Sequence, residues 1–122
     1  MNRIKQFSKS LSYAFRGLKY IIKKEKNFQN EVAIGMLVIL AMIYFKVTRS
    51  EMVVLFIIIT GVLVMEILNT IVERVVDVLK PRVNPYARLI KDLMAASVLL
   101  AAILSTIIGF IIFFPYIIKI IK

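Results

Sequence analysis

Three long apolar stretches constrain what this sequence can fold into. They cover residues 32–45, 52–72 and 93–118, and the single charged residue inside them is Glu66. The third stretch has 26 residues, which is more than the roughly 20 that a helix needs to cross a bilayer. A membrane β-barrel is excluded because its strands would alternate apolar and polar residues strictly. The stretches therefore predict an all-α integral membrane protein with three transmembrane helices.

Composition excludes the other classes to which a chain of 122 residues could belong. Hydrophobic residues make up 61% of the chain, against roughly 45–50% in a typical soluble domain. A soluble domain of this size leaves much of its surface in water, so it could not hide so much apolar surface. Disorder requires low hydrophobicity and is excluded too. We predict one membrane domain over residues 1–122, with its net charge of +10 gathered at the membrane faces.

The N-terminal segment carries a different pattern. Apolar residues such as Ile4, Phe7 and Leu11 recur in steps of three and four, and basic residues occupy the other faces. This pattern is typical of an amphipathic helix on an anionic membrane surface. A signal peptide is the alternative, but the segment lacks the uninterrupted apolar core of one. We predict a surface helix over residues 1–25, transmembrane helices over 28–47, 52–73 and 92–118, and a cytoplasmic loop over 74–90.

Lysine and arginine counts predict which ends face the cytoplasm. Residues 1–26 hold eight of them, residues 46–51 two, residues 74–92 five and the C-terminal tail two. Basic residues are enriched in the cytoplasmic loops of membrane proteins. The alternation therefore predicts a cytoplasmic N-terminus, a cytoplasmic second loop and an external C-terminus.

The sequence contains neither cysteine nor histidine, which narrows the chemistry open to it. Disulfides, zinc–thiolate sites and histidine general bases are excluded. Acid–base or metal chemistry must then use the seven carboxylates, a donor set that suits Mg²⁺, Ca²⁺ or Mn²⁺. The chain also lacks the glycine-rich loops of P-loop proteins and protein kinases, so these motifs do not predict nucleotide binding.

Polar residues form one stripe along the second predicted transmembrane helix. Its members are Glu66, Asn69, Glu73 and Asp77. At about 100° per residue they lie within about 80° of one another, and Glu66 lies ~10 Å deeper in the membrane than Glu73. Ionisable side chains inside a membrane are costly and therefore indicate function. The stripe must face a polar cavity, another helix or another subunit.

Further charged residues flank this stripe on the predicted cytoplasmic side. Glu25 lies where the surface helix ends, at the depth expected for Glu73, and two carboxylates at one depth can hold Mg²⁺ together with substrate phosphates. Lys91 and Asp92 open the third span, where a lysine can bind phosphate. Two other interpretations stay open on spacing alone. One is a small cation-handling or transport protein, and the other is a structural protein with ordinary interfacial charges.

Four motifs occur in a fixed order along the chain. They are AFRGL at 14–18, EKNFQNE at 25–31, EILNTIVERVVD at 66–77 and KD at 91–92. In this order they resemble the prokaryotic diacylglycerol kinase family, which includes undecaprenol kinases. The third motif, with the Lys-Asp pair 14 residues after its aspartate, is a specific signature. The resemblance covers nearly the whole chain, from Phe7 to Ile112.

The resemblance implies a homotrimeric lipid kinase of the bacterial inner (cytoplasmic) membrane. Such a kinase transfers the γ-phosphoryl group of ATP, with Mg²⁺, to the hydroxyl of a lipid, in sites built between neighbouring subunits. Glu66 would be the catalytic base, and Glu25 and Glu73 would hold the metal. Glu31 and Glu66 would contact the lipid. The residues implied in ATP binding are Tyr13, Gly17, Glu25, Asn69, Glu73, Asp77, Lys91 and Asp92.

The sequence departs from the family pattern at three positions. Gln6 stands where better-known members have a basic residue, and Arg82 where an acidic residue is frequent. Met94 interrupts the small residues that follow the Lys-Asp pair. These departures concern the nucleotide side and leave the carboxylate stripe intact. Undecaprenol and diacylglycerol both stay open as acceptors, with undecaprenol slightly favoured, and no nucleic-acid partner is expected.

Overall fold

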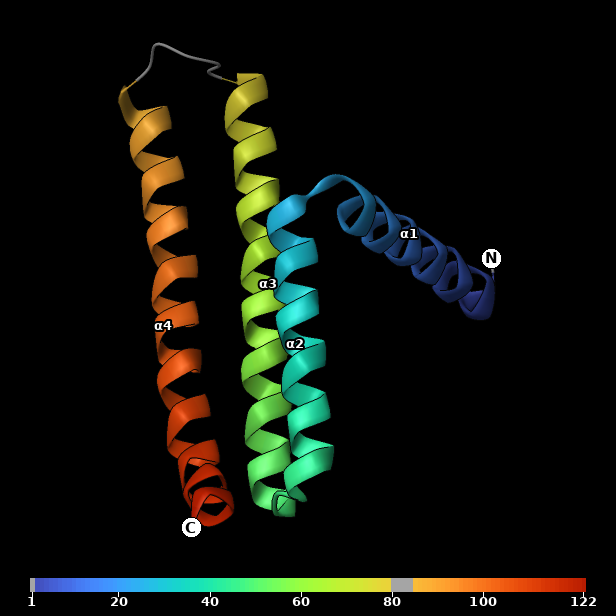
Figure 1. Ribbon diagram of the computed structural model, residues 1–122. Coiled ribbons are helices and arrows are strands. Elements are labelled where there is room, and N and C mark those ends of the chain that lie inside the picture. Colours follow the sequence, from blue (N-terminus) through green and yellow to red (C-terminus); the bar gives the residue numbers. More distant parts are fainter. Residues whose placement is uncertain (1, 80–84) are drawn as a thin grey trace.

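Four α-helices make up the part of the chain that the computed structural model describes, residues 2–79 and 85–122. They are α1 (Arg3–Lys24), α2 (Lys26–Phe45), α3 (Arg49–Leu79) and α4 (Pro85–Ile121). The last three run side by side as a bundle, and α1 projects away from it (Figure 1). These three helices are long and apolar enough to cross a membrane. The predicted all-α membrane architecture is therefore confirmed.

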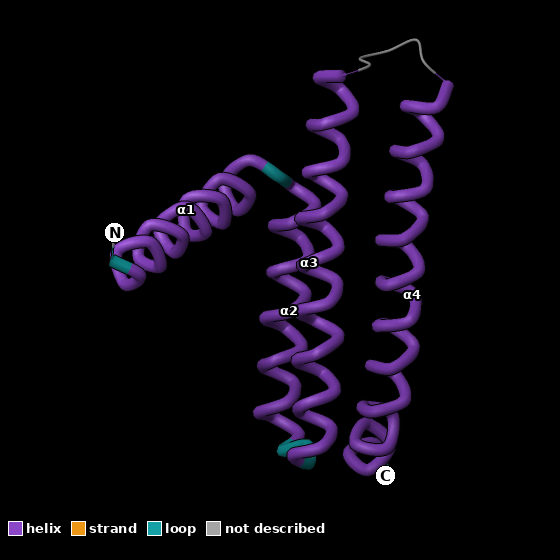
Figure 2. Tube along the Cα trace, turned by 180° about the vertical axis from the view of Figure 1, so that it is seen from behind, coloured by secondary structure: helices purple, strands orange, loops and turns teal. Residues whose placement is uncertain are grey.

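A tight turn joins α2 to α3 at one end of the bundle (Figure 2). Lys46 ends α2 in the left-handed region, with φ 52° and ψ 55°. A capping box then starts α3. The backbone N–H of Thr48 donates to Glu51 Oε1 at 3.0 Å, and the N–H of Glu51 donates to Thr48 Oγ1 at 3.2 Å. These reciprocal bonds satisfy donors that the start of a helix leaves free, so the turn is well defined.

The buried core lies at this same end of the bundle. Its members are Met42, Val47 and Leu55. From α4, Phe113 and Tyr116 pack against them. The Tyr116 hydroxyl also donates a hydrogen bond to the Glu51 carboxylate, which ties the end of α4 to the start of α3. This cluster is therefore remote from α1.

At the opposite end, α3 and α4 are longer than predicted. α3 continues past residue 73 to Leu79, and α4 begins at Pro85 rather than at residue 92. The sequence between Gly61 and Pro81 contains no glycine or proline, so no residue there interrupts the helix. Proline suits the first position of a helix because its missing N–H has no partner to lose there. Residues 80–84 of the predicted loop, with Arg82 among them, lie outside the described residues.

A single-residue break separates α1 from α2. Glu25 has an extended backbone at the break, with φ −106° and ψ 112°. The side-chain amide of Gln29 donates to the carbonyl oxygens of Ile22 and Lys23, at 2.8 and 3.3 Å. Carbonyls in the last turn of a helix lack intrahelical partners, so Gln29 stabilises the end of α1 and fixes the elbow.

The apolar face of α1 is largely exposed. Phe7 and Phe15 are each 66% exposed, and Ile21 is the one buried residue of the helix. A continuous apolar face of this kind needs a covering surface, and a bilayer headgroup region would supply one. The placement of α1 on a membrane surface stays a prediction.

Candidate active site

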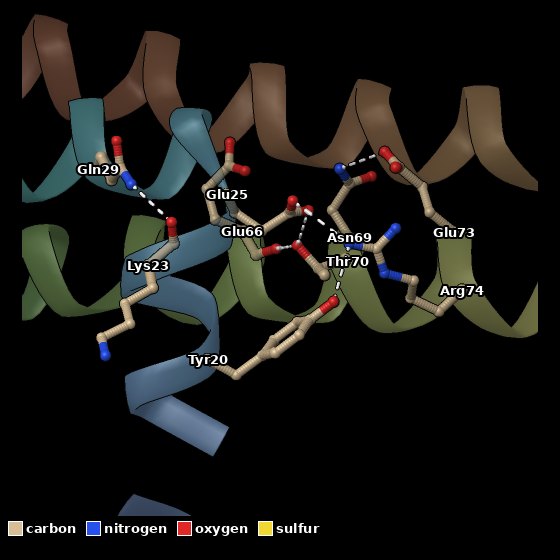
Figure 3. Close-up of polar contacts among 9 residues, drawn as sticks. All are labelled: Tyr20, Lys23, Glu25, Gln29, Glu66, Asn69, Thr70, Glu73 and Arg74. Carbon is tan, nitrogen blue, oxygen red and sulfur yellow. Dashed lines mark hydrogen bonds and ion pairs between the residues drawn. The ribbon is translucent and has the colours of Figure 1, made fainter. Parts of the chain in front are cut away.

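The predicted polar stripe lies in the C-terminal half of α3. Its residues Glu66 and Asn69 lie near the α1–α2 elbow (Figure 3). Glu66 is the one charged side chain that is buried within residues 2–79 and 85–122, with an exposed fraction of 7%. The carboxylates of Glu31, Glu73 and Glu25 lie within electrostatic range of it. Four acidic groups from α2, α3 and the elbow therefore gather in one region. Such a gathering of like charges favours the binding of a cation.

Asn69 and Glu73 are joined one turn apart on this stripe. The Asn69 side-chain amide donates a hydrogen bond of 3.0 Å to Glu73 Oε1. The amide oxygen of Asn69 is buried and has no hydrogen-bond partner within the described structure. An unpaired buried acceptor costs free energy, so it is suited to accept a hydrogen bond or to coordinate a cation.

Glu25 is brought to α3 by two residues that the sequence analysis did not select. The Thr70 hydroxyl lies 3.4 Å from Glu25 Oε1, and Arg74 Nη2 lies 3.4 Å from Glu25 Oε2. Arg74 also donates to the Tyr20 hydroxyl of α1 at 3.3 Å (Figure 3). On a helical wheel, Thr70 and Arg74 continue the stripe at about 40° and 80° from Glu66. That signal was present in the sequence.

Asp77 and Lys91 face each other between α3 and α4. Lys91 Nζ lies 2.7 Å from Asp77 Oδ1, and the two side chains are 38% and 53% exposed. Asp92 follows on α4, is exposed, and makes no ion pair with the described residues. At the outer end of the stripe, the accessible ammonium group of Lys91 therefore lies beside the carboxylate of Asp77, and Asp92 is its neighbour in sequence.

Two of the predicted nucleotide residues lie away from this region within one chain. Tyr13 and Gly17 are on α1, which leads away from the bundle (Figure 1). At 1.5 Å per residue they are about 18 Å and about 12 Å along the helix from Glu25. The guanidinium of Arg16 lies 5.6 Å from the centre of the Tyr13 ring. A single chain does not bring these two residues to the stripe.

An apolar groove of about 510 Å³ runs between α2, α3 and α4. Glu31 is its one acidic lining residue, and Phe45 and Ile117 lie at its other end. Gly35 lines it where α2 approaches α3 closely, since a Cβ there would lie 3.1 Å from Ile59 Cγ2. The groove is therefore apolar along the membrane and acidic towards the elbow.

The donor set fits a divalent cation by its chemistry. No three acidic side chains within residues 2–79 and 85–122 come close enough to hold a metal by themselves. Mg²⁺, however, is usually bound by one or two carboxylates together with waters and substrate phosphates. Glu73, with the unpaired oxygen of Asn69 beside it, and Glu25 at the elbow are carboxylates that such a set would use.

Comparisons with known proteins identify a family and two relatives. The model of the family described as prokaryotic diacylglycerol kinase matches residues 12–113. The undecaprenol kinase of Bacillus subtilis is 33% identical over 114 residues, which are 93% of this chain and 93% of that protein. The diacylglycerol kinase of Synechocystis sp. is 34% identical over 101 residues, which are 82% of this chain and 58% of that protein.

Proposed function

The chain belongs to the prokaryotic diacylglycerol kinase family, and we propose that it transfers the γ-phosphoryl group of ATP to the hydroxyl of a membrane lipid. Undecaprenol is the acceptor that we propose first, and diacylglycerol is the second candidate. The similarity to the B. subtilis undecaprenol kinase over nearly the full length of both chains supports this order. We place the protein in the bacterial inner membrane, with a cytoplasmic N-terminus and an external C-terminus.

The apolar groove is the observation that carries this proposal. It has the character of a lipid-chain site along α2, α3 and α4, with Glu31 at its acidic end. The buried Glu66 lies within electrostatic range of Glu31. A lipid whose chain occupies the groove would therefore present its hydroxyl to carboxylates at the level of the elbow. This combination supports a lipid kinase over a simple ion pathway, which needs no chain-binding groove.

In phosphoryl transfer, a protein contributes mainly by positioning the reactants and by neutralising their charge. The lipid oxygen attacks the γ-phosphorus, the bond from that phosphorus to the bridging oxygen breaks, and its electron pair leaves with ADP. Glu66 accepts the hydroxyl proton as the bond forms, since it is the buried carboxylate of the site. The water-poor surroundings of Glu66 strengthen its interactions with the reacting groups.

The residues around Glu66 would bind the nucleotide. Glu25 and Glu73 would hold Mg²⁺, which when bound neutralises negative charge on the phosphates. Asn69 donates a hydrogen bond to Glu73 through its amide, and its unpaired oxygen would face the reacting groups. Lys91 would exchange its contact with Asp77 for the phosphates, since both partners are accessible. Asp77 and Asp92 would line the same side.

A trimer would complete the site. Tyr13 and Gly17, which a single chain holds away from the stripe, would then reach the nucleotide in a site shared between subunits. The apolar part of α4 supports an assembly, because only 6% of an 18-residue apolar segment of this helix is buried within one chain. Lipid can cover this surface as well, so the assembly is tested by the mass of the protein in detergent.

Phosphate transfer from labelled ATP in mixed micelles tests the function. Undecaprenol and diacylglycerol are offered separately, each with Mg²⁺ and each with a chelator in place of Mg²⁺. We expect metal-dependent labelling, stronger with undecaprenol. Labelling of diacylglycerol alone would support the proposed kinase activity and would make diacylglycerol, rather than undecaprenol, the acceptor. If the folded protein labels neither lipid, the kinase proposal is wrong, and cation transport along the carboxylate stripe becomes the function to test.

A further inference from the structure

Arg74 is the one cation paired with Glu25 in the described part of the chain, and it holds that carboxylate loosely. The distance from Arg74 Nη2 to Glu25 Oε2 is 3.4 Å, whereas charge-assisted hydrogen bonds usually span about 2.7–2.9 Å. The Arg74 side chain is 52% exposed, so water screens its charge. Exposed ion pairs of this kind contribute little to stability. The contact is therefore easily exchanged.

The other contact of Glu25 is incomplete as well. The Thr70 hydroxyl has one proton to donate. It lies 3.0 Å from the Glu66 carbonyl oxygen and 3.4 Å from Glu25 Oε1. The shorter contact is the ordinary bond of a helical threonine to the carbonyl four residues before it. Glu25 thus receives only long contacts, and its lone pairs are available to a better cation.

We propose that Arg74 is a replaceable cation at Glu25, which a divalent metal displaces when it binds there. This inference rests on the proposed function, because it takes Glu25 as a metal ligand. Without metal, the guanidinium offsets part of the charge of Glu25, which is one of the carboxylates around Glu66. A doubly charged ion at Glu25 repels the guanidinium and offers the carboxylate shorter bonds. Arg74 is then a positioning residue, which lowers the affinity of the empty site for metal.

The displacement of Arg74 by a metal would also affect α1. Arg74 links α3 to α1 through the Tyr20 hydroxyl, at 3.3 Å. When the guanidinium leaves Glu25, this three-residue link between Tyr20, Arg74 and Glu25 is broken at one of its two contacts. Metal binding therefore weakens the attachment of α1 to α3 next to the elbow.

Mn²⁺ binding in the absence of nucleotide and lipid substrate tests the proposal. Free Mn²⁺ is measured by electron paramagnetic resonance, with the full-length protein in an uncharged detergent. We expect Arg74→Gln to bind Mn²⁺ about fivefold more tightly than the wild type, as removal of a competing exposed ion pair predicts. Arg74→Lys keeps the charge and is expected to lie between the wild type and Arg74→Gln.

Two further variants make the result specific. Arg88→Gln removes one positive charge from an exposed α4 residue that makes no ion pair with the described residues, and we expect no change in Mn²⁺ affinity. In a Glu25→Gln background, Arg74→Gln is expected to have no effect. Unchanged or weaker Mn²⁺ binding by folded Arg74→Gln would overturn the proposal, as would an effect that persists without Glu25.

The two proposals fail in different ways. An active lipid kinase whose Arg74→Gln variant binds Mn²⁺ as the wild type does would overturn the exchange and leave the kinase in place. Tighter Mn²⁺ binding by Arg74→Gln, in a protein that phosphorylates no lipid alcohol, would overturn the kinase and support Arg74 as the competitor at Glu25.

Discussion

The Asn69 amide donates a 3.0 Å hydrogen bond to Glu73, and the same amide keeps its buried oxygen without a partner. The Asn69 side chain thus donates a hydrogen bond to the Glu73 carboxylate, while its own oxygen remains an unpaired acceptor beside it. A buried acceptor without a partner costs about 1–3 kcal/mol. Such a cost indicates that the oxygen binds a water, an ion or a substrate group.

The first prediction concerns this residue. Asn69→Leu removes the unpaired oxygen and the bond to Glu73 together, so we expect the melting temperature to stay the same or to rise. Phosphate transfer should fall at least about tenfold, as for loss of a positioning group. Thermal unfolding in detergent and labelled phosphate transfer give the two values. A lower melting temperature with full activity would show that Asn69 has only a structural role.

Glu66→Gln tests the catalytic base. Glutamine keeps the shape but cannot accept the hydroxyl proton, so we expect the rate of transfer to fall about 10²–10⁴-fold. Glu51→Gln makes the same chemical change at the other end of the bundle, where glutamine can still accept from Tyr116. That control should retain wild-type activity. An active Glu66→Gln variant would exclude Glu66 as the base.

The pair of Asp77 and Lys91 should matter for nucleotide binding more than for stability. Their ion pair is accessible, and exposed pairs contribute about 0–1 kcal/mol to unfolding. Lys91→Met should therefore leave the melting temperature nearly unchanged and raise the KM for ATP about tenfold. Asp77→Asn should have a smaller effect on KM, because the lysine remains. The prediction is wrong if Lys91→Met changes kcat alone.

Two glycines in the spans allow a matched comparison. A methyl group at Gly61 would meet open space, whereas one at Gly35 would lie 3.1 Å from Ile59 Cγ2. Alanine in a helix is about 0.5–1 kcal/mol more favourable than glycine. Gly61→Ala should therefore stabilise the protein. Gly35→Ala should gain less or nothing, because α2 and α3 must separate slightly. Equal melting temperatures for the two variants would contradict this close contact.

Gln29 should control how firmly α1 is held. Gln29→Leu removes both bonds to the last carbonyls of α1, so the elbow should sample a wider range of angles. The chain has no cysteine, so spin labels can be attached at Ser10→Cys and Val78→Cys without further changes. We expect a broader distance distribution in the Gln29→Leu protein. The same distribution in both proteins would show that Gln29 does not fix the elbow.

The sequence predicted the elements that follow from local rules. Apolar length predicted three spans, and helical periodicity predicted the stripe that carries Glu66 and Glu73 on one helix. The end of α3 was predicted too early, because the apolar stretch that predicted this span ends at residue 72. The structure continues the helix to Leu79, since charges alone do not break a helix.

Contacts between distant segments were beyond a single sequence. Arg74 meets Glu25 across 49 positions, and Thr70 meets it across 45. Such pairs depend on how α2 packs against α3, which neither periodicity nor charge counting specifies. The apolar groove is unpredictable for the same reason, because its lining comes from three helices. The metal, nucleotide and trimer assignments, which rest on the family resemblance, stay predictions.

The break at Glu25 has a mechanical consequence. The one non-helical residue between α1 and α2 also carries the carboxylate that contacts Thr70 and Arg74. With α2 packed against α3, any change in the tilt of α1 is absorbed by the backbone torsions of that residue. The Glu25 side chain therefore moves when α1, a helix of 22 residues, changes its tilt. With α1 on a membrane surface, as predicted, a change in the packing of the surrounding headgroups would be transmitted to this carboxylate through the backbone of Glu25.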